Sequence, residues 1–135
     1  MLKFVDLKKE TPLKRETKKR NQDFNEIYDE FINAKAKEQS SRCSQCGVPF
    51  CQIHCPLSNN IPDWLKLTAE GRLQEAYEVA QSTNNMPEVC GRICPQDRLC
   101  EGNCVLSNQA MELLRLALLK NTLQILLGKK VGLNQ

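Results

Sequence analysis

With 135 residues, 41% of them hydrophobic and only 5% aromatic, the chain can bury one modest apolar core, and such a core usually needs a disulfide, a metal or a partner to hold it together. The formal net charge is only +3, and Phe4 is the single aromatic residue among the N-terminal basic residues, which argues against a nucleic-acid-binding protein. The first residues, M-L-K-F-V-D-L-K-K-E, lack the apolar stretch of a secretory signal, so we expect a cytoplasmic chain.

Residues 1–18 form a basic N-terminal arm in which Pro12 interrupts any early helix. Residues 1–20 contain eight basic side chains against three acidic ones, whereas the remainder has 11 basic and 13 acidic residues. Such an arm can dock on an acidic partner, or it can be a solvated tail. The sequence leaves both interpretations open.

A helical domain is expected over residues 19–106, beginning with an amphipathic helix from about Lys19 to about Gln39. Apolar side chains recur there at three- and four-residue steps: Phe24, Ile27, Tyr28, Phe31 and Ile32. Polar residues fill the opposite face, so we interpret the apolar stripe as a packing surface.

A second helix is expected after Asn60, which can cap it. Pro62 suits its first turn and Gly71 ends it. We interpret Trp64, inside this helix, as a core residue.

A third helix is expected over residues 73–81, with Tyr77 packing in the core, and a short helical turn should follow Pro87 and lead into Cys90. No segment shows the sustained alternation that predicts a strand. The predicted fold class is therefore all-α, a small helical domain with two cysteine-rich loops.

All eight cysteines lie in two groups of four. The first group is C-S-Q-C-G-V-P-F-C-Q-I-H-C-P (43–56) and the second is C-G-R-I-C-P-Q-D-R-L-C-E-G-N-C (90–104). An intracellular chain keeps its thiols reduced, so we predict metal ligands in preference to a disulfide framework.

The spacing of these cysteines favours iron and sulfur. In two-cluster ferredoxins, the cysteine that precedes a proline ligates the other cluster, and both groups contain a Cys-Pro pair, Cys55–Pro56 and Cys94–Pro95. We therefore expect a crossed arrangement. One centre takes Cys43, Cys46 and Cys51 plus one C-terminal thiol, and the other takes Cys55 plus the remaining C-terminal thiols.

Zinc is the alternative metal. Structural zinc sites favour paired C-x2-C sequences, and this chain contains only one such pair. We interpret His54, which lies beside Cys55, as polar surface and not as a ligand.

The segments R-C-S-Q-C-G-V-P-F-C-Q-I-H-C-P-L-S-N-N-I-P-D-W and C-G-R-I-C-P-Q-D-R-L-C-E-G-N-C resemble the N-terminal iron–sulfur domain of NADPH-dependent glutamate synthase small (beta) subunits. A similar domain opens dihydropyrimidine dehydrogenase. The resemblance covers roughly residues 1–106. It implies an α-helical domain with two [4Fe–4S] clusters that passes electrons from NADPH and FAD towards a large subunit, where glutamine and 2-oxoglutarate become glutamate.

The resemblance also implies a set of ligands. The first cluster would be held by Cys43, Cys46, Cys51 and Cys104. Three corners of the second would be held by Cys55, Cys94 and Cys100. In this family the fourth corner can be a Glu or Gln beyond the last cysteine, and Cys90 is the alternative.

The tail at 107–135 departs from the family. Its Leu-rich run, 113–127, is too short and too polar to span a membrane, and it can be a packing or oligomerising helix. The genetic code offers another interpretation. The sequence from Met111 onward can be back-translated into permitted codons. When those codons are read in the frame that starts at their third base, they encode G-A-I-T-I-G-A-I-E-K-Y-I-T-D-T-A-W, which resembles the family segment. We therefore hypothesise an out-of-frame translation, in which the Glu ligand is encoded across Leu119 and Lys120.

The chain contains no G-x-G-x-x-G fingerprint, so FAD and NADPH would belong to downstream domains and we assign no catalytic residue. Three hypotheses follow. The first is an iron–sulfur electron-transfer domain, a truncated piece of a glutamate synthase small chain, serving its large subunit or another flavoprotein oxidoreductase. The second is a free-standing ferredoxin-like protein, and the third is a structural zinc-binding module.

Overall fold

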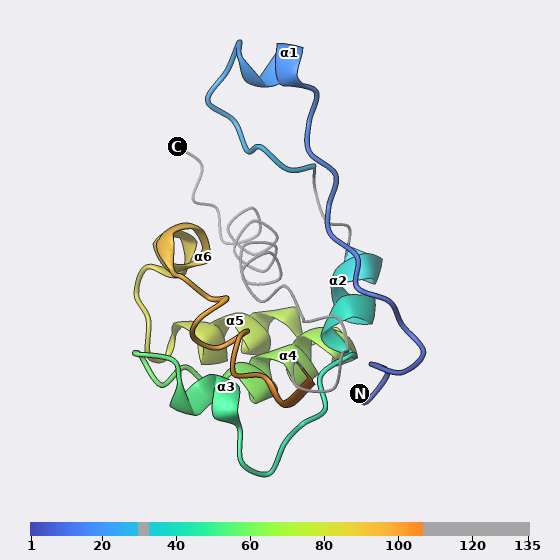
Figure 1. Ribbon diagram of the computed structural model, residues 1–135, viewed down its shortest axis with the longest axis vertical. Helices are drawn as coiled ribbons and strands as arrows, with labels where there is room; N and C mark the ends of the chain where they lie inside the picture. Colours follow the sequence, from blue (N-terminus) through green and yellow to red (C-terminus); the bar gives the residue numbers. More distant parts are fainter. Residues whose placement is uncertain (30–32, 107–135) are drawn as a thin grey trace.

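The computed structural model describes residues 1–29 and 33–106 of the chain (Figure 1). Their helices are α1 (Thr17–Arg20), α2 (Asn33–Ser40), α3 (Phe50–Ile53), α4 (Ile61–Glu70), α5 (Leu73–Gln81) and α6 (Pro87–Ile93). Over these residues there is no strand, only an isolated antiparallel bridge between Lys14 and Tyr28. The predicted all-α fold class is confirmed. Among the residues described, none of the helices has the length and apolar character needed to cross a membrane.

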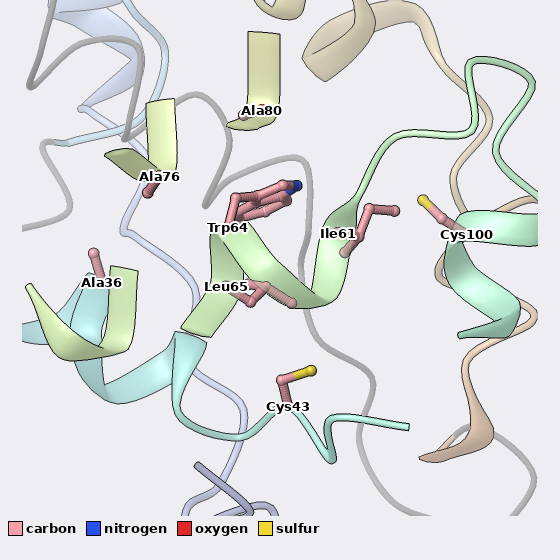
Figure 2. Packing of buried hydrophobic residues seen from close by; sticks show 8 residues of the cluster. All are labelled: Ala36, Cys43, Ile61, Trp64, Leu65, Ala76, Ala80 and Cys100. Atoms are coloured by element: carbon pink, nitrogen blue, oxygen red, sulfur yellow. The ribbon is translucent and has the colours of Figure 1, made fainter. Parts of the chain in front are cut away.

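Helix α4 is the centre of the fold, and it packs against both α2 and α5. Its side chains Trp64 and Leu65 are each only 1% exposed, and Ala36 of α2 and Ala76 of α5 belong to the same buried cluster (Figure 2). The interpretation of Trp64 as a core residue is confirmed, and Tyr77 packs partly buried against the same cluster.

The ends of α4 follow from its sequence. Pro62 occupies the first turn, where its missing N–H costs no hydrogen bond. Gly71 ends the helix with φ of 85°, a left-handed conformation that glycine adopts without steric cost. One detail differs from the prediction, because the side chain of Asn60 makes no capping hydrogen bond. Its Nδ2 atom donates instead to Oδ2 of Asp63, at 2.6 Å.

Helix α5 has the predicted bounds, and α6 is the predicted helical turn at Pro87 that contains Cys90. The loop expected from Cys43 to Pro56 contains one short helix, α3. Helices α3 and α6 therefore each present one cysteine, Cys51 and Cys90.

The prediction of one helix from Lys19 to Gln39 is wrong over residues 21–29, which form no helix between α1 and α2. Their backbone pairs with the preceding segment: Arg15 N donates to Ile27 O at 2.9 Å, and Asp29 N donates to Leu13 O at 2.8 Å. Phe24, which the predicted stripe would bury, is fully exposed. Ile27 of the stripe is also exposed, and Tyr28 is partly buried. Phe31 and Ile32 lie outside the described residues.

An ion pair accounts for this local difference. The guanidinium of Arg15 donates to both carboxylate oxygens of Asp23, at 2.6 and 3.0 Å, and to the backbone oxygen of Glu26 at 3.0 Å. The Arg15 guanidinium holds the pKa of Asp23 down at about 2. These contacts hold residues 21–29 in a hairpin-like turn. The helix was predicted from hydrophobic periodicity, which contains no information about such contacts.

The N-terminal arm lies against the start of the first cysteine loop. The backbone N–H of Leu2 donates to Cys43 O at 3.1 Å, and that of Lys3 donates to Ser41 O at 3.0 Å. Farther along the arm, the side chain of Gln39 accepts from Glu10 N and donates to Lys8 O. Residues 2–10 thus help to position Cys43.

Candidate iron–sulfur site

The first cavity, which we call cavity A, is lined by cysteines from both groups. They are Cys43, Cys46, Cys51 and Cys104. Its apolar wall comes from the first turns of α4 through Ile61, Pro62 and Leu65, and from Phe50 of α3. Three thiols from the first loop thus share one apolar space with the last cysteine of the chain.

The second cavity, cavity B, has a volume of about 250 Å³. The other four cysteines line it: Cys55, Cys90, Cys94 and Cys100. The wall also contains Trp64 and three amide side chains, those of Asn59, Asn84 and Gln96. Cavity A also has polar side chains in its lining, those of Ser44 and Glu101.

Ile61 lines both cavities and is itself 4% exposed. Figure 2 shows its side chain between Trp64 and Cys100, with Cys43 on another side of the same α4 turn. The first turn of α4 is therefore the shared wall of the two cavities. The structure brings the cysteines together in the two sets of four that the crossed arrangement predicts, and the ligand role of each thiol stays a prediction.

The charges of the thiols are coupled mainly within the same two sets, and Cys100 of cavity B also acts on Cys51 of cavity A. Burial, with smaller contributions from the nearby Cys43 and Cys104, raises the pKa of Cys51 to about 12. Burial also raises the pKa of Cys100 to about 12, with added contributions from Glu101, Cys55 and Cys94. These thiols stay neutral in the metal-free chain, and a bound cation is what would stabilise their thiolates.

The first cysteine loop contains polar groups close to two sulfurs. Gln45 has φ of 52°, and its Nε2 donates to Cys43 Sγ at 3.3 Å and to Pro62 O at 2.8 Å. The hydroxyl of Ser44 lies 3.0 Å from Cys46 Sγ. Sequence reasoning did not find these two residues, because nothing in their spacing distinguishes them from ordinary loop polar residues.

The second cysteine loop is tightly turned after Cys94–Pro95. The backbone oxygen of Gln96 accepts from both Glu101 N, at 2.9 Å, and Gly102 N, at 3.1 Å. A Cβ atom on Gly102 would lie 2.0 Å from the backbone oxygen of Asp97, so only glycine fits there. This close approach brings Cys100 and Cys104 back towards the two cavities.

His54 is exposed and lines neither cavity, and its Nδ1 lies 2.9 Å from Phe50 O. All eight cysteines are free thiols. In the described part of the chain, no three His, Cys, Asp or Glu side chains converge on a position for a single metal ion. The thiols instead surround two spaces, and soft thiolate donors arranged in that way fit iron–sulfur clusters.

Comparison with known proteins agrees with this chemistry. Residues 20–124 match the family described as dihydropyrimidine dehydrogenase domain II, 4Fe–4S cluster. Over 106 residues the chain is 70% identical to the "Glutamate synthase [NADPH] small chain" of Azospirillum brasilense and 52% identical to that of Escherichia coli K12, and each match covers 78% of this chain and 22% of the relative. It is also 47% identical over 88 residues to the E. coli "Putative oxidoreductase UacF", which covers 64% of this chain and 14% of the relative.

The chain thus spans about a fifth of the length of the curated glutamate synthase relatives that it matches. Its helical fold, its eight free thiols and the family match agree on the kind of domain. This chain belongs to the dihydropyrimidine dehydrogenase domain II, 4Fe–4S cluster family, and it is an iron–sulfur electron-transfer domain of the kind found in glutamate synthase small chains.

Proposed function

We propose that the chain holds two [4Fe–4S] clusters, one in each cavity, and that it relays electrons from NADPH and FAD towards the large subunit of a glutamate synthase. The observation that carries this proposal is that eight thiols line two cavities in two sets of four. The similarity to glutamate synthase small chains supports the choice of enzyme. FAD and NADPH would be bound by domains beyond this chain, and we place the assembly in the cytoplasm.

The proposed ligands are those implied by the family. Cys43, Cys46, Cys51 and Cys104 hold the first cluster. Cys55, Cys94 and Cys100 hold three corners of the second, and Cys90 or a ligand other than cysteine holds the fourth. Cys90 is supported by its place in the lining of cavity B.

When bound, the clusters supply one-electron transfer. The residues of this chain have three tasks. The thiolates hold the iron, and the apolar first turns of α4 limit the access of water. Ile61 separates the two sites while leaving them close to each other. Because electron transfer within proteins needs no catalytic acid or base in the relay itself, we propose no catalytic residue.

A second candidate is a relay in a different flavoprotein oxidoreductase. The similarity to UacF, a putative oxidoreductase, favours it. Reconstitution with a glutamate synthase large subunit and the flavin-containing part of a small chain would separate the two, since only the first candidate restores NADPH-dependent glutamate formation.

Iron and sulfide analysis tests the number and kind of clusters. After anaerobic reconstitution we expect about eight iron and about eight acid-labile sulfide atoms per chain, with the brown colour of iron–sulfur proteins. About four of each would leave room for one cluster only. Tight zinc binding without sulfide would instead support the structural zinc module.

We also propose that residues from about 107 onward are translated out of frame. The match to the A. brasilense relative spans 106 residues, 78% of this chain, which supports the proposal, although the family match runs to residue 124. DNA sequencing across the codons for residues 104–135 and several hundred bases beyond tests it. We expect a shifted frame that stays open and reaches a G-x-G-x-x-G segment, and bases that forbid this reading would make the Leu-rich tail genuine.

A further inference from the structure

We propose that Asn84 donates a hydrogen bond from Nδ2 to a sulfur atom of the cluster in cavity B and thereby raises the reduction potential of that cluster. This inference rests on the proposed function, because it requires a cluster in that cavity. It makes Asn84, between α5 and α6, a tuning residue that is not itself a ligand.

The orientation of the Asn84 amide is fixed by one backbone contact. Its Oδ1 atom accepts a hydrogen bond from the N–H of Met86 at 3.0 Å. Because a backbone N–H can only donate, the amide oxygen must face Met86, and Nδ2 points elsewhere. Asn84 is only 7% exposed, and its buried Nδ2 has no hydrogen-bond partner among the residues that the structure describes.

A buried donor without a partner is rare and calls for an explanation. Asn84 lines cavity B together with Cys55, Cys90, Cys94 and Cys100. Thiolate and sulfide sulfurs in that cavity would be the acceptors that the amide nitrogen lacks. The spare N–H therefore fits a cluster better than it fits an empty cavity.

Asn59, in the same wall, provides the contrast. Its Nδ2 donates to Ala80 O at 2.8 Å and to Thr83 Oγ1 at 3.0 Å, and its Oδ1 accepts from Trp64 Nε1 at 3.0 Å. Every polar atom of the Asn59 side chain is thus used to hold α4 and α5 together. Asn59 is structural, whereas Asn84 keeps a donor for the cavity.

The direction of the effect follows from charge. Reduction adds one negative charge to a cluster that already carries thiolate and sulfide sulfurs. An N–H donor aimed at those sulfurs stabilises the reduced form more than the oxidised one, which raises the potential. Loss of that donor should make the cluster harder to reduce.

The test is a redox titration, monitored by electron paramagnetic resonance, of the full reconstituted chain and of the variants Asn84→Asp and Asn84→Leu. Aspartate keeps the size of the side chain and the acceptor for Met86 N–H, but it lacks the donor. At a fixed potential we expect the ratio of reduced to oxidised second cluster to fall about tenfold, which is about 59 mV for a one-electron couple. The first cluster, in cavity A, should keep its potential.

Asn85→Asp is the matched control, since Asn85 is the adjacent residue and is exposed. It adds the same charge close by without removing a buried donor, so its second cluster should titrate like that of the unmodified chain. If both clusters assemble in the Asn84 variants and neither potential moves, the inference is wrong while the proposed function stands. If the unmodified chain holds no cluster in cavity B, the proposed function itself fails.

A spectroscopic measurement covers the case in which both Asn84 variants lose the second cluster. In the unmodified chain labelled with ¹⁵N at the asparagine side-chain amides, pulsed paramagnetic resonance of the reduced second cluster should detect a ¹⁵N coupling, and the Asn85→Asp chain should keep it. Absence of that coupling in a chain that holds the cluster would overturn the inference.

Discussion

Replacement of Cys51 by serine should remove the cluster that we propose for cavity A and leave the one proposed for cavity B, so iron should fall from about eight to about four atoms per chain. Serine keeps the size of the side chain but offers a hard, weakly acidic hydroxyl, which binds cluster iron less tightly than a soft thiolate does. Cys51 lies in α3 and lines only cavity A. Iron and sulfide analysis of the reconstituted variant, with paramagnetic resonance of the reduced form, measures the loss.

Cys100→Ser is the counterpart for cavity B, and the two variants should lose different signals. His54→Ala serves as the control, because His54 is exposed and lines neither cavity. If Cys51→Ser and Cys100→Ser abolish the same signal, the division of the thiols into two sites is refuted. Cys90→Ser then tests the fourth ligand of the second cluster. If this variant keeps about eight iron atoms per chain, that ligand is a residue other than cysteine.

Replacement of Trp64 by alanine should destabilise the domain by about 3–5 kcal/mol, the usual cost of deleting a large buried aromatic side chain. Trp64 is 1% exposed, lines cavity B and donates from Nε1 to Asn59 Oδ1. The loss comes close to the whole stability of a small domain, so the metal-free variant should be largely unfolded. Urea unfolding followed by far-ultraviolet circular dichroism provides the measurement.

Phe24→Ala is the matched control for Trp64→Ala. This substitution also removes an aromatic ring, but the side chain of Phe24 is fully exposed. The free energy of unfolding should therefore change by less than about 0.5 kcal/mol. Equal effects of the two substitutions would mean that Trp64 is not the centre of the core, or that Phe24 is covered in solution.

The parts of the fold that sequence reasoning predicted are those with strong local signals. The bounds of α4 and α5 follow from Pro62, Gly71 and the apolar stripe of each helix, and these signals act within a few residues. The grouping of the first four thiols also followed from a local feature, because Cys55, which precedes Pro56, lines the other cavity from Cys43, Cys46 and Cys51. The second Cys-Pro pair does not divide its group in this way, since Cys94 lines cavity B with Cys90, and Cys104 is the thiol that lines cavity A.

The failures come from contacts between residues that are distant along the chain. Residues 21–29 have helical periodicity, but the ion pair of Arg15 with Asp23 and backbone pairing with residues 13–15 hold them in another conformation. Asn84 was missed for a different reason, since the contact that matters is with a residue only two positions away. Its significance depends on which of its atoms Met86 leaves unused, and only the folded chain determines that.

The crossed lining of the two cavities also bears on when this protein can mature during its synthesis. Cavity A needs Cys104 and cavity B needs Cys55 together with Cys90, Cys94 and Cys100, so neither is complete in a nascent chain that ends before residue 100. A ribosome-bound chain with only the first four cysteines exposes three thiols of the cavity A set and one thiol of the cavity B set. Insertion of the two proposed clusters must therefore follow the emergence of the second cysteine group, and an early-acting assembly factor would meet an incomplete binding site.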